Sequence, residues 1–301
     1  MRNFPATGRN LFLPTACTRD VISKGPQTKE RLRMIETASF EEVTQIRMSR
    51  EIGGKPVYWV AAYLVDGLLI DTGCSYTATE LAAFLADRPV HRIVNTHFHE
   101  DHIGGNRTLQ EKFGVEIFAP ADSVPLIARE AKLFPYQETV WGYPAPSETR
   151  PLPEVIRTDR YLFDVIDTPG HSAGHAALVE KSRGWCFSGD IFAREKMKFI
   201  RPEEDMGETV ASMKRLITLP TDRLILFTSV GRIVEDGRRA LQDCIQYIEE
   251  LSRRAKALEM KGLGIPEIIR ELFGGEHAFA ALSNGQYTTE NLVRSVLKME
   301  D

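Results

Sequence analysis

The chain has 301 residues, which is enough for one large domain or two ordinary ones. At this length a hydrophobic core can form without a disulfide or a metal ion to hold it together. Hydrophobic residues make up 43% of the chain and charged residues 27%, which excludes a mainly disordered, collagen-like or coiled-coil protein. The 38 basic and 42 acidic side chains leave a net charge of −4, so no overall positive potential attracts nucleic acid or a membrane surface.

The spacing of the cysteines and the length of the apolar runs indicate in which cellular compartment the protein is expected. Four cysteines lie far apart and form no CxxC pair, which is typical of neither a zinc ribbon nor a disulfide framework. No stretch reaches the roughly 18 apolar residues that a membrane-spanning helix needs, and the apolar run near the start is too short for a signal peptide. We therefore expect a reduced, cytoplasmic protein.

Residues 1–42 are rich in Pro, Gly, Thr and charge, and they show no sustained helix or strand period. We expect an N-terminal extension that packs on the rest of the chain or on a partner. From residue 43 the pattern changes to short apolar, β-branched runs, which predict strands at 43–48 and 57–65. The dipeptide Asp66-Gly67 then predicts a tight hairpin turn into a further strand.

The following residues alternate between helix and strand patterns. Thr77 and Glu80 have capping-box spacing at the start of a helical run. Further elements are expected as a strand at 91–96, a helix at 106–113, a strand at 115–120 and a helix at 122–132. A Pro-rich segment at 134–153, which contains Trp141 and Tyr143, predicts a long loop. These two aromatic side chains either line a substrate pocket or pack against the sheet.

A second series of strands and helices follows this loop. Strands are expected at 161–166, 176–180, 185–188 and 223–229, with a helix at 208–218. Two mixed runs of similar order predict an α+β architecture in which two sheets pack face to face with helices outside. We assign this body to residues 43–240. Residues 241–301 continue a helical pattern that begins near residue 236, and they form a C-terminal helical region.

Three of the seven histidines fall within six positions, in the segment HFHEDH that directly follows an apolar strand. In an extended segment, residues two apart point the same way, so His97 and His99 present their imidazoles to one metal ion. Asp101 and His102 come after the strand ends, where they are placed to face a second ion nearby. Three histidines and a carboxylate at this spacing predict a metal centre.

This segment resembles the HxHxDH signature of the metallo-β-lactamase superfamily of metal-dependent hydrolases. Three further blocks follow the family's order over about 120 residues. They are Asp71-Thr72-Gly73, the TPGHSAGH segment at 168–175, and Ser188-Gly189-Asp190. The resemblance covers residues 43–240 and implies a four-layer αββα sandwich with the metal site at one edge, here followed by the C-terminal helical appendage.

The resemblance also implies roles for individual residues. The first ion would be bound by three imidazoles, the second by Asp101 and His102, with Asp190 bridging the two. The complete set of implied metal ligands is His97, His99, Asp101, His102, His171 and Asp190. Asp71 would orient a ligand without binding an ion, whereas His175 would be structural.

One block departs from the family pattern. The family's last ligand histidine follows a late strand, whereas Val230 stands at that position here. Valine cannot bind a metal, so we expect the second site to bind its ion more weakly than the first. Three explanations are open: an altered chain that has lost one ion, a natural one-metal enzyme, or a site completed by Ser229 or water.

We expect one or two Zn²⁺ ions per chain, with Mn²⁺ or Fe²⁺ as alternatives. Such an ion lowers the pKa of bound water from about 15.7 to about 7 and polarises a carbonyl group. The resemblance therefore implies a hydrolase that acts on a small ester, lactone or thioester, with Asp101 accepting or relaying the proton. Two other functions stay open: a mononuclear iron enzyme that oxidises persulfides, and a non-catalytic scaffold. The C-terminal region and the N-terminal extension would cap the body, shape substrate access or form a homodimer contact, and simple packing onto the body is the open alternative.

Overall fold

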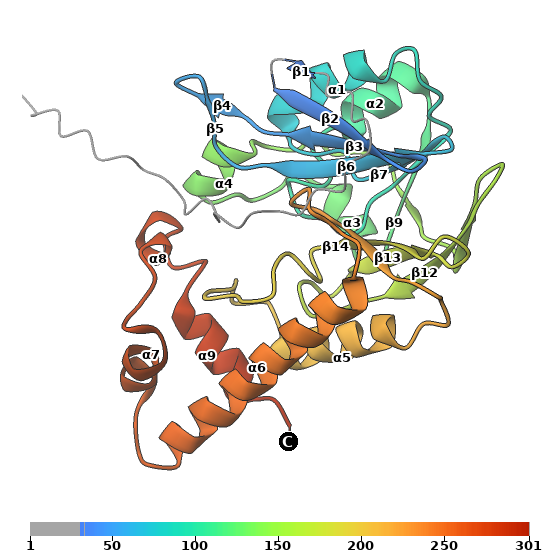
Figure 1. The fold of residues 1–301 in the computed structure, drawn as a ribbon. Coiled ribbons are helices and arrows are strands. Elements are labelled where there is room, and N and C mark those ends of the chain that lie inside the picture. Colours follow the sequence, from blue (N-terminus) through green and yellow to red (C-terminus); the bar gives the residue numbers. More distant parts are fainter. Residues whose placement is uncertain (1–30, 33, 301) are drawn as a thin grey trace, which may run out of the picture.

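Two β-sheets lie face to face in the computed structural model, which describes residues 31–32 and 34–300 (Figure 1). The first sheet has eight strands in the order β1-β2-β3-β6-β7-β8-β9-β10. Its strands are β1 (Arg31–Leu32), β2 (Ile35–Phe40), β3 (Val43–Met48), β6 (Val60–Val65), β7 (Leu68–Ile70), β8 (Arg92–Val94), β9 (Glu116–Ala119) and β10 (Arg150–Pro151).

The second sheet has six strands in the order β11-β12-β13-β14-β15-β16. They are β11 (Val155–Arg157), β12 (Leu162–Asp167), β13 (Ala176–Glu180), β14 (Trp185–Gly189), β15 (Ile225–Thr228) and β16 (Ile233–Val234). A small separate hairpin is formed by β4 (Glu51–Ile52) and β5 (Lys55–Pro56).

Helices cover the outer face of each sheet (Figure 1). The first sheet carries η1 (Ser75–Thr77), α1 (Ala78–Phe84) and α2 (Asn106–Phe113), and the loops that follow contain α3 (Val124–Ile127) and α4 (Pro135–Val140). The second sheet carries α5 (Met206–Ile217) and α6 (Gly237–Glu259), followed by α7 (Ile265–Phe273), α8 (Phe279–Leu282) and α9 (Thr289–Leu297). The predicted four-layer αββα architecture with extra C-terminal helices is thus confirmed.

Hydrophobic side chains of alternating strand positions fill the space between the sheets. The largest of them are fully buried aromatic residues, Phe163, Trp185, Phe187 and Phe227. Burying a side chain of this kind stabilises the fold by about 1.5–3 kcal/mol relative to leaving it exposed. This core fixes the two sheets relative to each other, and with them the loops that leave their edges.

Both predicted domain boundaries need correction. β2 pairs with β3 along its whole length, from Ile35 opposite Met48 to Phe40 opposite Val43, so the first sheet begins before residue 43. The rest of the expected extension lies mostly outside the described part of the chain. At the other end, the boundary at 240 and 241 falls inside α6. Leu292 of α9 shares one hydrophobic core with Val179 of β13, so the C-terminal helices are packed onto the second sheet.

Several local predictions can be compared with the structure. Asp66 and Gly67 form a two-residue turn with φ values of 49° and 76°, as an Asp-Gly hairpin turn requires. The predicted capping box at Thr77 is wrong, because its hydroxyl bonds to the Cys74 carbonyl and not to the helix backbone. The helix expected at 122–132 is a single turn, and the loop expected at 134–153 contains α4.

Among the described residues, no helix is long and apolar enough to cross a membrane. Three of the cysteines lie in this part of the chain, and all three are buried and unpaired: Cys74, Cys186 and Cys244. The fourth, Cys17, lies outside the described residues.

Strand ends define where the functional residues meet. β7 and β8 run parallel in the first sheet, and β14 and β15 run parallel in the second. The carboxyl ends of parallel strands meet at one edge of their sheet. The segments that leave these ends carry Asp71, the histidine-rich segment 95–102, Asp190 and the turn at Val230.

Candidate metal centre

Hydrogen bonds to carbonyl groups of its own backbone shape the histidine-rich segment after β8. The Asn95 side chain donates to the carbonyl oxygen of His102 at 3.1 Å, and the His102 amide donates to the carbonyl of His99 at 2.9 Å. The chain therefore curls back on itself within eight residues. As a result His97 and His99 are both buried, and His97 Nε2 lies 3.0 Å from His99 Nδ1.

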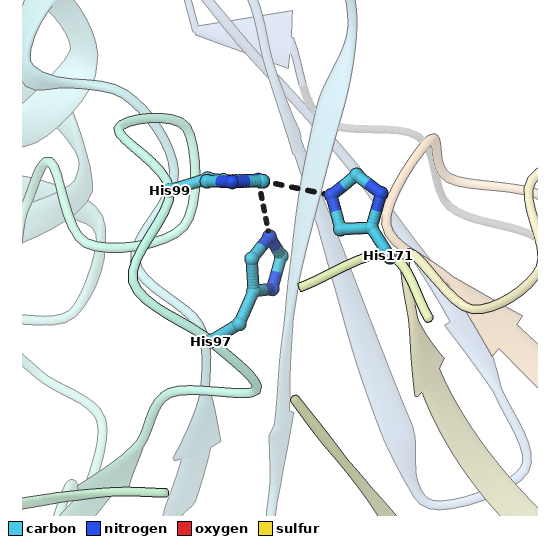
Figure 2. A group of neighbouring side chains, drawn as sticks. All are labelled: His97, His99 and His171. Carbon is cyan, nitrogen blue, oxygen red and sulfur yellow. Dashed lines mark hydrogen bonds between the residues drawn. The ribbon is translucent and has the colours of Figure 1, made fainter. Parts of the chain in front are cut away.

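His171 joins these two histidines from the loop between β12 and β13. Its Nε2 lies 2.9 Å from His99 Nδ1, and the three side chains converge on one point in Figure 2. One ligand atom from each of His97, His99 and His171 falls within 4.8 Å of the others. Ligand nitrogens around a tetrahedral zinc ion are about 3.3 Å apart, for zinc–nitrogen bonds of about 2.0–2.1 Å. The three imidazoles fit one metal ion.

A second group of ligand atoms lies beside the first. His97, His102 and Asp190 also place one ligand atom each within 4.8 Å of one another. The Asp190 carboxylate lies between the two groups, with Oδ1 3.3 Å from His102 Nε2 and Oδ2 3.3 Å from His171 Nε2. Asp101 Oδ2 is 3.9 Å from His102 Nε2 and belongs to neither group.

Two atoms of the second group, His102 Nε2 and Asp190 Oδ1, are buried and lie 3.3 Å apart, but neither makes a hydrogen bond of good geometry. A buried polar atom left entirely without a partner costs about 1–3 kcal/mol, and a poorly aligned contact recovers only part of this cost. A metal ion bound between them would remove this cost. The donor set of this chain therefore fits the metal that its sequence motifs imply.

Three of the four ligand histidines, His97, His102 and His171, have the second ring nitrogen fixed by a neighbouring side chain, which selects the nitrogen that faces the ion. His102 Nδ1 lies 2.8 Å from Asp71 Oδ2, so its Nε2 faces the centre. The hydroxyl of Thr96 donates to the same carboxylate oxygen at 2.9 Å and lies 3.1 Å from His97 Nδ1. Asp71 itself has a φ of 60°, a conformation that is uncommon for residues other than glycine.

His171 is oriented by a residue that sequence reasoning missed. Its Nδ1 lies 3.1 Å from Glu204 Oε2, and the other carboxylate oxygen accepts a hydrogen bond from the Arg201 amide at 2.7 Å. Glu204 follows the Gly-Asp block by 14 positions and belongs to no motif, so no signal in a single sequence identifies it. The same holds for Arg201, whose guanidinium pairs with Glu100 at 3.3 Å.

The other three histidines, His175, His91 and His277, are not in the two ligand groups. His175 accepts a hydrogen bond from the Asp190 amide at 3.0 Å and lies 2.7 Å from the Thr168 hydroxyl, so both its nitrogens are used within the protein. It holds the backbone of a ligand and does not face the ligand groups. His91 lies against the Asp66-Gly67 turn, and His277 packs on Phe199, both away from the centre.

Burial and charge set the protonation of the site. Burial lowers the pKa of His97 and His99 well below the usual value, and neighbouring histidines lower it further. Burial raises the pKa of Asp101 to about 6. Burial alone would also raise the pKa of Asp190, but the charges on His102 and His171 outweigh it and hold this pKa well below its usual range. Burial alone would lower the pKa of His102 and His171, but neighbouring carboxylates outweigh it and raise this pKa above its usual value. Neutral imidazoles bind a metal ion, so an ion bound here would displace the protons of these two histidines.

Val230 lies in the turn directly after β15, and this turn lies next to the centre. The Ser229 amide donates to the carbonyl of Gly189 at 3.4 Å, one residue before Asp190. Val230 is half-buried and offers no ligand atom. The Ser229 hydroxyl is buried and makes no hydrogen bond.

Comparisons with known proteins give the same family. The model of the metallo-beta-lactamase superfamily matches residues 60–228, which is more than half of the chain. A hydroxyacylglutathione hydrolase from Nitrosomonas eutropha is 28% identical over 173 residues, which cover 56% of this chain and 58% of the relative. A protein named hydroxyacylglutathione hydrolase GloC, from Haemophilus influenzae, is 25% identical over 150 residues, covering 46% of this chain and 69% of the relative.

Solved structures agree on the fold. A metallo-beta-lactamase family protein from Thermus thermophilus superposes with a TM-score of 0.59 at 19% identity, covering 84% of this chain and 90% of that protein. A beta-lactamase domain protein from Burkholderia ambifaria gives a TM-score of 0.58 at 18% identity, covering 90% and 87%. At this identity the likeness extends to the fold alone. The family model together with the site geometry shows that the chain belongs to the metallo-β-lactamase superfamily.

Proposed function

We propose that this protein is a metal-dependent hydrolase that cleaves a small ester, lactone or thioester. The observation that carries the proposal is the convergence of His97, His99 and His171, whose ligand nitrogens lie 2.9–3.0 Å apart along the cluster. A bound ion at this position would supply a carbonyl-polarising Lewis acid and lower the pKa of a bound water to about 7. A hydrolase of this kind needs no further cofactor.

The chain's own residues supply the remaining functions. Asp71 and Glu204 orient His102 and His171, which keeps the ligand set in one geometry before substrate arrives. Asp101 belongs to neither ligand group and lies beside the second, 3.9 Å from His102 Nε2, so its carboxylate is placed to accept and pass on a proton. Because the carboxylate is buried, water competes weakly for this proton.

The relatives favour a thioester among the three bond types. Two of those described above are named hydroxyacylglutathione hydrolases, and a hydroxyacylglutathione is a thioester. The match spans less than two thirds of the Nitrosomonas relative, so its whole activity is not carried over to this chain. A small-molecule thioester is therefore the first substrate class to test.

We propose in addition that the second site is weaker than the first. It retains His102 and Asp190, with Asp101 close by, but Val230 provides no ligand. Three imidazoles would hold the first ion. The second site would share Asp190 with the first, and Val230 leaves it without the last histidine of the family pattern. The expected content is one tightly bound ion, with Zn²⁺ first among the candidates, and a second that is lost on dialysis.

The test combines metal analysis with a substrate panel. Protein purified without added metal is analysed for Zn, Mn and Fe, and then assayed against acyl-glutathione thioesters, aryl esters and lactones. Bound zinc or manganese with hydrolysis that is lost in His97→Ala supports the proposal. Bound iron with oxidation of a persulfide would contradict it, and so would the absence of turnover on every substrate with either metal, which a scaffold would give.

A further inference from the structure

The segment of residues 200–205 lies between β14 and α5 and contacts the loop that carries His171. Glu204 Oε2 lies 3.1 Å from His171 Nδ1. One residue later, the Asp205 amide donates to the carbonyl of Gly170 at 2.7 Å. The ligand is therefore held twice by the same segment, once through its ring and once through the backbone beside it.

The 200–205 segment also contacts the histidine-rich loop. Arg201 Nη2 lies 3.3 Å from Glu100 Oε1, and Gln137 donates to the same oxygen at 2.8 Å. Glu100 stands between His99 and Asp101 in the sequence, so its side chain fixes the backbone of this turn. One segment thus reaches both of the polypeptide stretches that meet at the metal centre.

On its other side the segment is held by the C-terminal helices. Ile200 and Thr288 exchange two backbone hydrogen bonds, at 3.3 and 3.1 Å. Arg201 Nε donates to the Tyr287 hydroxyl at 2.8 Å. Asn291, in the first turn of α9, donates to the carbonyl of Ile200 at 3.2 Å.

Ser295 of α9 makes a second link to the same segment. Its hydroxyl donates to the carbonyl of Glu204 at 3.3 Å and accepts from the Met206 amide at 2.9 Å. It therefore bonds to the residue that orients His171 and to the first residue of α5. Both bonds are side chain to backbone, so they fix the position of the chain at this point.

Three polar residues of these links are buried, where water replaces a lost hydrogen bond poorly. Arg201 and Glu100 are 5% and 4% exposed, and Ser295 is 8% exposed. A buried ion pair is stable only when its geometry is good and its other hydrogen bonds are made. The Tyr287 hydroxyl supplies one of these to Arg201, so the position of the guanidinium depends on the C-terminal region.

We propose that Tyr287 and Ser295 are positioning residues for the metal centre. They hold the 200–205 segment, through which Glu204 orients His171 and Arg201 restrains the turn at Glu100. The C-terminal helices thus set the affinity of the first metal site as well as adding to the core. This inference rests on the metal binding of the proposed function and is independent of its substrate.

The test removes single hydroxyl groups in full-length protein. Tyr287→Phe and Ser295→Ala delete the two links and retain the ring and the helix. Ser252→Ala is the matched control, because this hydroxyl of α6 donates to the carbonyl of Val296 at 2.7 Å and touches none of the residues above. Tyr76→Phe is the tyrosine control, since its hydroxyl donates to the Glu138 carbonyl at 2.8 Å.

The readouts are the Zn²⁺ dissociation constant of the first site, from competition with a chromogenic chelator, and the visible spectrum of the Co²⁺ protein. Loss of a residue that orients a metal ligand typically weakens metal affinity about 10–100-fold, which is expected for Glu204→Ala. Tyr287→Phe and Ser295→Ala act one contact further out, so a loss of about three- to tenfold is expected. Both controls should stay within about twofold of the parent protein.

A double variant separates positioning from general stability. If Ser295 acts through Glu204, adding Ser295→Ala to Glu204→Ala should leave the affinity within about twofold of Glu204→Ala alone. Unchanged affinity and cobalt spectrum in Tyr287→Phe and Ser295→Ala would overturn the inference, even if both lower the melting temperature. A parent protein that binds Zn²⁺ but hydrolyses nothing would leave the inference standing and overturn only the proposed function. A parent protein that binds no Zn²⁺ would overturn both.

Discussion

His171 Nε2 lies 2.9 Å from His99 Nδ1, although 72 positions separate the two residues in the sequence. One belongs to the loop after β8 of the first sheet and the other to the loop between β12 and β13 of the second. The metal centre is therefore built across the sandwich, and it exists only when both sheets have formed and packed. Ligand binding and tertiary structure are coupled at this point.

This coupling predicts the effect of His171→Ala. The variant keeps both sheets but loses one of three imidazoles, so the first site should lose far more affinity than the roughly 10–100-fold that loss of an orienting residue costs. Zinc content after dialysis, measured by atomic emission, should fall from about one ion to near zero. His277→Ala, which removes a histidine that packs on Phe199, is the control and should retain the metal.

Removing the metal should also lower the stability of the parent protein. Binding to the folded state alone stabilises it by about 2.7 kcal/mol when the free ligand is at 100 times its dissociation constant. Chelator treatment is thus expected to lower the melting temperature of the parent protein and to leave that of His171→Ala almost unchanged. Equal shifts in the two proteins would mean that the stabilising ion binds elsewhere.

Asp71→Asn tests the orienting role of the carboxylate that Thr96 and His102 share. Asparagine keeps the size of the side chain and tolerates the φ of 60°, so the fold should change little. The amide cannot accept a hydrogen bond with both its polar atoms, so His102 loses its fixed orientation. Catalytic efficiency is expected to fall about 10–100-fold, with a melting temperature close to that of the parent protein. A large loss of stability instead would assign Asp71 a structural role.

The histidine-rich segment illustrates what a sequence can and cannot reveal. The resemblance carried by the four blocks in order predicted the fold, and five of the six expected ligands lie in the two ligand groups, whereas Asp101 lies beside them. Glu204 and Arg201 could not be found, because their contacts depend on how α5 and α9 pack and leave no local spacing. The capping-box prediction at Thr77 failed for a related reason. The Thr77 hydroxyl donates to the Cys74 carbonyl and accepts no hydrogen bond from the helix backbone.

The sequence also did not predict that the first sheet begins before residue 43. Ile35–Phe40 forms β2 but is rich in Thr, Ser and Glu, so its apolar alternation is weak. It becomes a strand because β3 offers an unpaired edge and because Ile35 enters the core. Tertiary pairing of this kind overrides local propensity.

Gly104→Ala tests the close approach behind the ligand loop. A Cβ atom at this position would lie 2.2 Å from the backbone nitrogen of Ser75 and 2.3 Å from the Cys74 carbonyl carbon. Both are backbone atoms that cannot rotate away, so the loop must shift, at a cost of about 1–3 kcal/mol or more. Gly207→Ala is the matched control, because there the nearest atom is 3.2 Å away, at the end of the Asp205 side chain. Urea unfolding should separate the two, and equal midpoints would contradict the assigned packing.

Val230→His addresses the second site directly. The Ser229 amide in this turn bonds to the carbonyl of Gly189, next to Asp190, so we expect an imidazole at position 230 to reach His102 and Asp190. His102 Nε2 and Asp190 Oδ1, which lie 3.3 Å apart, would then share an ion with a third ligand. Bound zinc after dialysis should rise from about one toward two ions per chain, and Val230→Asn, which is polar but a poorer zinc ligand, should leave it near one. If Val230→His binds no more zinc than Val230→Asn, the turn does not face the second site, and its weakness must have a cause other than valine.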